Sequence, residues 1–284
     1  MNRKESPGFV PVDYDPFAQR ELEAGVPATE PQLEVLTACL IGGEDANRSY
    51  NESNSLRLQG MLNLPALQNA LQELVNRHEA LRAAFSADGT YLLIGKPYPL
   101  TVDCQDLTHL SADEQQAFLQ RFLQENATTA FNLKQGPLFR IALHKLDAAQ
   151  HLLTLTAHHI VCDGWSFGIL LEELGQLYSA YARNEVPHLA ASPSLLSYAL
   201  EQKKFAGSKQ YQEIEQYWID QYKTDVPMLD LPADFPRPTV RTFTGQRLDV
   251  ALAPETTKAL KQLGAKAGCS FVTTLLAAFE LFIH

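Results

Sequence analysis

The hydrophobic pattern of residues 63–77 predicts an amphipathic helix. Apolar residues recur there three and four positions apart, which places them on one helical face: Leu67, Ala70, Leu71, Leu74 and Val75. Asn63 precedes this stretch and is a favourable N-cap, while Pro65 suits the first turn. We therefore expect a helix that buries this face against the core.

Other stretches alternate apolar and polar residues and therefore predict strands. They cover residues 55–60, 81–85, 91–94, 137–146, 151–158 and 242–251. Asp88-Gly89 separates two of them and is typical of a hairpin turn. Helical spacing predicts helices near residues 29–41, 111–123, 167–181, 194–206, 209–223, 256–264 and 270–283. Ser111 and Glu114 have the spacing of a capping box, and Thr29 is a further candidate N-cap.

Proline and polar residues indicate how the chain is divided. Residues 1–28 contain four prolines and little periodicity, so we expect a lead-in linker there. Because 284 residues exceed what one core usually takes, we expect two lobes with a boundary between Asn184 and Pro193. The first lobe is placed at 29–185 and the start of a second at 186–284. The last helix is strongly apolar and reaches His284 without a Gly or Asn cap, so we expect the second lobe to be truncated.

Composition argues against several classes of function. An apolar fraction of 45% and a charged fraction of 20% are typical of a soluble globular protein. A net charge of −10 without Lys and Arg clusters argues against nucleic-acid binding. The N-terminus lacks the apolar core of a signal peptide, and no apolar run approaches the ~18 residues of a membrane span. We therefore expect a cytoplasmic protein with no membrane partner. The four cysteines lack CxxC or metal-ligand spacing and are expected to be free thiols.

The residues best suited to chemistry lie between a predicted strand and a predicted helix, at His158-His159-Ile160-Val161-Cys162-Asp163-Gly164. Side chains alternate along a strand, so we expect His158 and His159 on opposite faces, with one locked into the structure and one facing a cavity. A neutral imidazole, with an unperturbed pKa near ~6.5, can accept or steer a proton. Asp163 could orient a histidine, hold the loop through an arginine or cap the helix. Gly164 opens a helix N-terminus, which favours developing negative charge.

Other interpretations of this turn remain open from spacing alone. His158 fits a hydrogen-bonded structural histidine better than a catalyst. A metal site is disfavoured because adjacent strand histidines diverge and no third or fourth ligand is evident. Cys162 could be a nucleophile, although a small buried thiol in a turn is the commoner case. The spacing therefore indicates acid-base chemistry and no specific reaction.

Residues 158–166 resemble the HHxxxDG motif of nonribosomal peptide synthetase condensation domains, members of the chloramphenicol-acetyltransferase-like superfamily. Three further segments agree in order and spacing. Arg77-His78-Glu79-Ala80-Leu81-Arg82-Ala83-Ala84-Phe85 resembles the family's RHExLRTxF segment, Ser197-Tyr198-Ala199-Leu200 its aromatic segment, and Tyr217-Trp218 its YW pair. Residues 29–34 depart from the family, because they keep the Gln but lack the Arg of a Ser-x-Ala-Gln-x-Arg pattern. The Phe-Val-Asn-Thr stretch of the family's second lobe has no counterpart, which again suggests truncation.

The resemblance implies an α/β fold (α+β, mixed sheet): an acetyltransferase-like lobe with helices around a mostly antiparallel or mixed sheet, then part of a second similar lobe. It implies amide formation between a donor acyl or peptidyl thioester and the amine of an acceptor aminoacyl thioester. Donor and acceptor carrier proteins would hold both substrates on phosphopantetheine, next to neighbouring synthetase domains, with no bound cofactor or metal. His159 would be the catalytic residue, as a base or by positioning the amine. The supporting residues would be His158, Asp163, Gly164, Arg77 and Arg82.

Related activities provide the competing predictions. An epimerisation domain keeps HHxxxDG, and a coenzyme-A-dependent acyltransferase belongs to the same superfamily. A cyclisation domain is disfavoured by His158 and Gly164, which that type replaces. A non-catalytic carrier-docking module is the alternative from a different class. We expect the fragment itself to be inactive, because half of the wall of the tunnel between the lobes would be absent.

Overall fold

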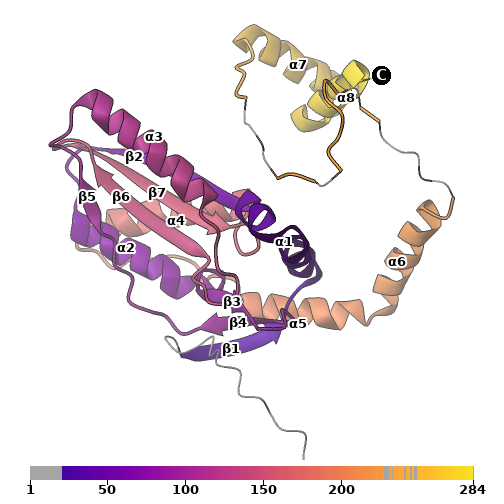
Figure 1. Ribbon diagram of the computed structural model, residues 1–284, viewed down its shortest axis with the longest axis horizontal. Coiled ribbons are helices and arrows are strands. Elements are labelled where there is room, and N and C mark those ends of the chain that lie inside the picture. The colour runs from indigo at the N-terminus through magenta and orange to yellow at the C-terminus, as the bar shows by residue number, and fades with distance from the viewer. Residues whose placement is uncertain are drawn as a thin grey trace, which may run out of the picture. The chain divides into compact units, whose positions relative to one another are not determined.

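Four strands form the larger of two β-sheets, in the order β2-β7-β6-β5, as Figure 1 shows. These strands are β2 (Asn51–Gln59), β5 (Cys104–Asp106), β6 (Phe139–Lys145) and β7 (Gln150–His158). β7 is antiparallel to both of its neighbours, while β5 runs parallel to β6. The sheet is therefore mixed and mostly antiparallel, as predicted.

The computed structural model describes residues 21–224, 226, 230–231, 233–239, 241–243, 245 and 248–283. Residues up to 243 form one compact unit, and residues from 244 onward form a second. Both sheets belong to the first unit.

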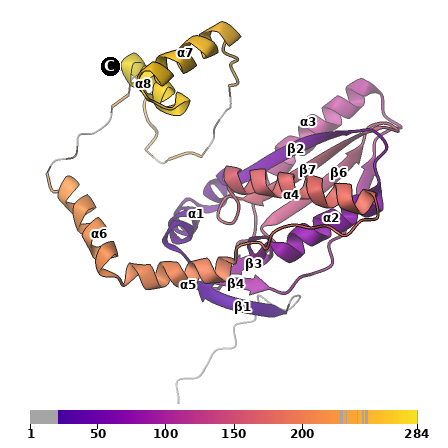
Figure 2. The same cartoon turned by 180° about the vertical axis from the view of Figure 1, so that it is seen from behind.

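Helices cover both faces of the larger sheet. α2 (Leu64–Arg77) and α4 (Gly164–Ala182) pack against each other on one face, which Figure 2 shows, and α3 (Ala112–Thr128) lies over the other face in Figure 1. The predicted apolar stripe of α2 is buried against leucines of β7 and the inner face of α4. The main core therefore lies between the sheet and these two helices.

A smaller antiparallel sheet has the order β1-β4-β3. It consists of β1 (Leu22–Pro27), β3 (Ala83–Phe85) and β4 (Tyr91–Gly95), and a short 3-10 helix, η1 (Glu79–Arg82), precedes β3. Its buried side chains form a second core with α1 (Glu30–Ser49) and with Ala199 of α5 (Leu195–Ala206). α6 (Lys209–Gln221) follows and buries none of its residues.

Local sequence signals account for where the main helices begin. Asn63 Oδ1 accepts the N–H of Ala66 at 3.1 Å and so caps α2. Ser111 and Glu114 form the predicted capping box of α3, and Thr29 begins a second one at α1. Each cap satisfies N–H groups that a first helical turn leaves without an internal partner.

The lead-in linker predicted over residues 1–28 includes a strand that the sequence did not predict. β1 lies inside that range, and it forms because β4 provides an antiparallel partner and the second core buries Val26. Composition gives no sign of this pairing, since it depends on a strand far along the chain. Residues 1–20 lie outside the described residues.

Several predicted boundaries also differ. The helix expected to end near Ile41 continues to Ser49 through a kink at Gly43, whose φ of 64° suits glycine. The strand expected over 81–85 begins at Ala83, because η1 occupies the first part. β5 was not predicted, since three residues carry too little periodicity. The described residues of 242–251 form no strand and have no strand partner.

The two compact units divide at residues 243 and 244, whereas the sequence placed the lobe boundary at 185 and 186. α5 belongs to the first unit because it packs against β1 and η1. The assignment of 29–185 and 186–284 to two lobes remains a prediction.

The second unit contains α7 (Pro254–Lys266) and α8 (Phe271–Ile283), which pack against each other. α8 buries none of its residues despite its apolar sequence. Among the described residues, no single helix is long and apolar enough to cross a bilayer. α7 and α8 taken together reach that length and composition, and they are bent by 102° at the break between them.

Candidate active site

The turn between β7 and α4 holds the two adjacent histidines. β7 ends at His158 and α4 begins at Gly164. His158 is fully buried, whereas the side chain of His159 is 46% exposed. The divergence predicted from strand alternation is present, and His159 is the histidine that is open to solvent.

His158 lies in a closed environment of rings and a thiol. Its ring centroid is 5.8 Å from that of Tyr50 and 6.2 Å from that of Phe131, and its Nε2 is 3.9 Å from Sγ of Cys39. Nδ1 accepts the backbone N–H of Ile160 at 3.2 Å, which fixes the start of the turn. Burial lowers the pKa of His158 to about 4, so the ring is neutral at neutral pH. These contacts support a structural role.

His159 is held by its backbone and faced by a carboxylate. Its N–H donates to the carbonyl oxygen of Tyr50 at 2.8 Å. Its Nδ1 lies 3.3 Å from Oε2 of Glu52, whose side chain is 32% exposed. Glu52 belongs to β2 and pairs with Ala157 of β7, two residues before the histidine. The exposed imidazole therefore has a nearby anion that the sequence did not reveal.

Asp163 caps α4. Its Oδ1 accepts the N–H of Ser166 at 2.8 Å and the hydroxyl of the same residue at 2.6 Å. The Ser166 hydroxyl is the main reason that the pKa of Asp163 is lowered. Of the three roles considered for this residue, the structure shows the cap. In the described part of the chain, no arginine forms an ion pair with Asp163.

Gly164 and Cys162 flank Asp163. A Cβ at Gly164 would lie 3.7 Å from Oε1 of Glu52, which is ordinary contact, so space does not require glycine here. Its predicted role in substrate approach remains a prediction. Cys162 is buried, and burial raises the pKa of its thiol to about 12. A thiol that stays protonated is a poor nucleophile, so Cys162 fits the structural alternative.

Arg77 and His78 bind one carboxylate on α4. Arg77 donates two hydrogen bonds to Glu173, both at 3.1 Å, and a third to the carbonyl oxygen of Ala190 at 2.7 Å. His78 Nε2 lies 2.8 Å from the same carboxylate, and its Nδ1 is 3.2 Å from the Ser192 hydroxyl. The end of α2 is thereby joined to α4 and to the segment that leads into α5.

Glu79 continues this connection. Its carboxylate accepts the Ser194 hydroxyl at 3.1 Å and the N–H of Leu196 at 2.9 Å, at the first turn of α5. Three consecutive residues, 77–79, thus fix the path of the chain over residues 190–196.

Arg82 has a separate structural environment. It is buried, and its Nε donates to the carbonyl oxygen of Val75 at 3.0 Å while Nη1 bonds Glu23 at 2.5 Å and the carbonyl oxygen of Gly95. It ties α2 to β1 and β4. The structure does not bring Arg77 or Arg82 into contact with His159, and the contacts of both support a structural role.

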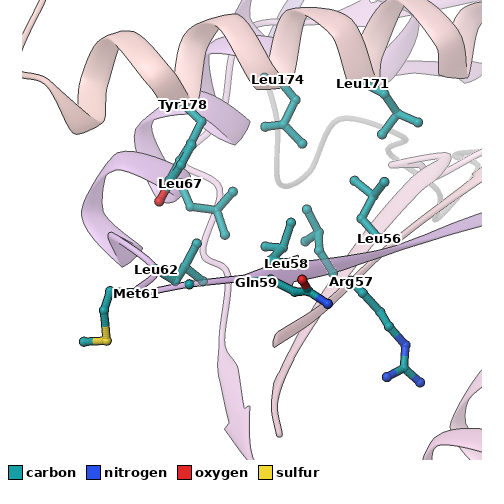
Figure 3. A pocket seen from close by; sticks show the side chains of 13 residues that line it. Leu56, Arg57, Leu58, Gln59, Met61, Leu62, Leu67, Leu171, Leu174 and Tyr178 are labelled. Carbon is teal, nitrogen blue, oxygen red and sulfur yellow. The ribbon is translucent and has the colours of Figure 1, made fainter. Parts of the chain in front are cut away.

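Two cavities lie near these elements, and neither is lined by His159. One, of about 220 Å³, lies behind the turn and is lined partly by Cys162, His78 and Glu173. The other, of about 310 Å³, lies between β2, α2 and α4. Figure 3 shows leucines of α4 facing leucines of β2 across it. Because its lining is mainly aliphatic and includes none of the predicted site residues, it is not the candidate active site.

The sequence missed Glu52 and Glu173. Neither follows from a local pattern, because each meets its partner across two elements that are distant in the chain. A register for the β2–β7 pair would have placed Glu52 next to the turn. Within the described residues, no group of three or more His, Cys, Asp or Glu is arranged to hold a metal ion.

Comparison with known proteins adds evidence independent of this geometry. A family profile described as "Condensation domain" matches residues 26–284. Malpinin synthetase from Mortierella alpina is 37% identical over 237 residues, and a chondramide synthase from Chondromyces crocatus is 34% identical over 264. These matches cover 82% and 91% of this chain but 3% and 7% of the relatives, so the chain spans a small part of their length.

A solved structure shows the same fold. The first condensation domain of the calcium-dependent antibiotic synthetase, in complex with a substrate analogue, matches with a TM-score of 0.73 at 23% identity. The match covers 93% of this chain and 62% of that chain.

Proposed function

We propose, because this chain belongs to the condensation-domain family, that it carries the catalytic turn of an amide-forming domain of a nonribosomal peptide synthetase. The donor would be an acyl or peptidyl thioester, and the acceptor would be the amine of an aminoacyl thioester. The observation that carries the proposal is the placement of His159, exposed at the end of β7 while His158 beside it is buried.

The reaction needs a proton acceptor and good alignment. The amine nitrogen attacks the thioester carbonyl carbon, a C–N bond forms, the C–S bond breaks, and the nitrogen loses a proton while the sulfur leaves as a thiol. An imidazole can take the proton from the amine and return it to the departing sulfur. His159 is the exposed imidazole at this turn, so we assign it this role.

His159 can also act by positioning the amine. Alignment of two tethered reactants can supply several kcal/mol, within the roughly 7–11 kcal/mol of good intramolecular cases. Both roles require the imidazole to project from a rigid support. Support comes from the β7 ladder and from the hydrogen bond between the His159 N–H and the carbonyl oxygen of Tyr50.

The remaining predicted site residues would hold this support in place. His158 fixes the turn from inside, and Asp163 fixes the start of α4. Arg77 and Arg82 anchor the end of α2 and the segments around it. We retain Gly164 as the point of close substrate approach.

The proposal includes partners and a location. Donor and acceptor carrier proteins would present both substrates on phosphopantetheine, next to neighbouring synthetase domains, in the cytoplasm. No bound cofactor is part of the proposed chemistry, because the thioester already carries the activated acyl group.

A histidine substitution tests the catalytic assignment. We expect His159→Ala, in the intact synthetase that carries this sequence, to reduce amide formation by about 10²–10⁴-fold, the usual contribution of a general acid or base. The measurement is single-turnover product formation with both carriers loaded, alongside circular dichroism to confirm folding. His109→Ala is the matched control, since His109 is exposed and lies outside the turn. If the His159→Ala enzyme forms the amide at the normal rate, His159 has no catalytic role.

A further inference from the structure

The carboxylate of Glu52 stands beside one particular nitrogen of the His159 ring. Oε2 of Glu52 is 3.3 Å from Nδ1, and the two side chains are 32% and 46% exposed. The distance exceeds the roughly 2.7–2.9 Å of a fully formed charge-assisted bond, and catalytic contacts often shorten only when substrate binds.

The chemistry of the pair decides where the ring proton resides. An ionised carboxylate can only accept, and a neutral imidazole has one N–H and one lone pair. A negative charge beside Nδ1 favours the form that carries its proton there and disfavours a lone pair facing the anion. Nε2 is then left as the basic nitrogen. His158 has the opposite arrangement, because its Nδ1 accepts the N–H of Ile160 and its proton therefore belongs on Nε2.

The backbone fixes both members of the pair. Glu52 lies inside the β2–β7 ladder opposite Ala157, and its neighbour Asn51 is opposite His158. The N–H of His159 bonds the carbonyl oxygen of Tyr50, which lies directly before β2. Two strands therefore set the separation between carboxylate and ring. The other oxygen of Glu52 lies next to Gly164 at the start of α4, where a helix N-terminus favours negative charge.

A contribution to stability is a weaker explanation for the pair. Ion pairs with this degree of exposure contribute little to folding, typically about 0–1 kcal/mol. A carboxylate that orients a histidine has a larger effect on acid-base chemistry, because it selects the tautomer and stabilises the imidazolium that forms when the ring accepts a proton.

We propose that Glu52 is a positioning residue for His159: its carboxylate holds the ring proton on Nδ1 and leaves the Nε2 lone pair to receive the proton of the attacking amine. The catalytic part of this inference, proton transfer to Nε2 of His159, rests on the proposed function. Its structural part, the tautomer of His159, is testable without turnover.

Nitrogen NMR of the His159 ring in the 284-residue chain tests the tautomer directly. We expect the unsubstituted chain to show a protonated Nδ1 and an unprotonated Nε2 in the neutral ring. Glu52→Ala should shift the population towards the Nε2–H form, and Glu52→Gln, whose amide oxygen can still accept, should restore much of the Nδ1–H form. Glu125→Ala is the matched control, because it removes one negative charge from an exposed position on α3. A His159 ring that is protonated on Nε2 in the unsubstituted chain, or unchanged in Glu52→Ala, would overturn the inference.

Activity in the intact synthetase gives the second readout. We expect Glu52→Ala to lower kcat by about 10–100-fold with little change in KM, less than the loss in His159→Ala, and Glu52→Gln to recover part of the loss. A folding defect would instead reduce the active fraction equally in Glu52→Ala and Glu52→Gln, and that result would overturn the positioning role. If His159→Ala is fully active while the tautomer of His159 responds to Glu52→Ala, the proposed function is wrong, but the effect of Glu52 on the His159 ring is confirmed.

Discussion

Two adjacent residues of the same type have different chemistry because one backbone step separates their environments. His158 is enclosed by Tyr50 and Phe131, while His159 projects into solvent beside Glu52. Burial removes the ring of His158 from acid-base chemistry at neutral pH by disfavouring its charged form. The same burial makes His158 a determinant of how stability depends on pH.

We expect the free energy of unfolding to fall as the pH is lowered from about 6.5 to about 4. The pKa of His158 is lowered to about 4 in the folded chain, so the unfolded state binds a proton first. The stabilisation is complete above the unfolded pKa of about 6.5 and is lost as the pH falls through the folded pKa, by up to about 3 kcal/mol. Urea unfolding at several pH values measures this slope.

His158→Gln should flatten that pH dependence, whereas His109→Gln, at an exposed position, should leave it unchanged. If His158→Gln does not fold, NMR titration of the unsubstituted chain can instead measure the pKa of the His158 ring. A His158 that titrates near its ordinary pKa would contradict the prediction.

The alternation of strand side chains was sufficient to predict that His158 and His159 diverge. It could not assign Glu52, because that residue becomes a neighbour only through the pairing of β2 with β7. Pairing depends on the energies of whole strands, and no local pattern encodes it.

At the scale of elements, the caps were the most predictable features. Asn63 and Ser111 act within one helical turn, so their roles follow from sequence neighbours alone. β1 was missed because its pairing with β4 leaves no local signal, and β5 was missed because it has only three residues. Asp163 was ambiguous from sequence because a helix cap and a residue that orients a histidine or pairs with an arginine share the same residue type, and its contacts with Ser166 show the cap.

Arg77 should contribute more to stability than an exposed arginine. It is only 15% exposed in its pair with Glu173. Arg77→Ala would remove two hydrogen bonds from that carboxylate, which would keep only His78 as a partner, and would remove the Arg77 donor from the carbonyl oxygen of Ala190. We expect a loss of about 2 kcal/mol in the free energy of unfolding. Arg183→Ala is the control, because the Arg183 pair with Glu185 is 62% and 56% exposed and should contribute less than about 1 kcal/mol. If urea unfolding shows the same loss of free energy of unfolding for Arg77→Ala and Arg183→Ala, the buried contacts of Arg77 add no stability.

At the scale of the whole molecule, the two compact units differ in how much they bury. α2 buries a complete face in the main core, while α8 buries none of its residues. Hydrogen exchange depends on such burial, because local opening costs little where few apolar contacts are lost.

We therefore expect backbone amides of α8 to exchange much faster than those of α2 and β7. Mass-spectrometric hydrogen exchange at several protein concentrations measures this difference. Protection of α8 that rises with concentration would indicate self-association through its exposed apolar side chains, and protection equal to that of α2 at every concentration would contradict the expectation.

Around the predicted lobe boundary, the sequence did not show which elements the chain contacts. Prolines and polar residues marked 184–193 as the boundary, and in the structure Arg77 and His78 bind residues 190 and 192 of this segment while α5 packs on β1. A proline-rich composition indicates that a segment is irregular, but it does not reveal which elements hold it.

The pairing of β7 gives the turn at residues 147–149 an unexpected importance. That turn lies at the opposite end of β7 from the histidines, yet it sets the offset between β6 and β7. Shifting a strand by one residue moves every side chain to the other face of the sheet. Because β7 is buried on both faces, such a slip would turn His158 towards the main core, where Ala157 now lies, and would move His159 away from Glu52. An insertion or deletion in this distant hairpin that shifted the register would therefore disrupt the proposed site without altering any of its amino acids.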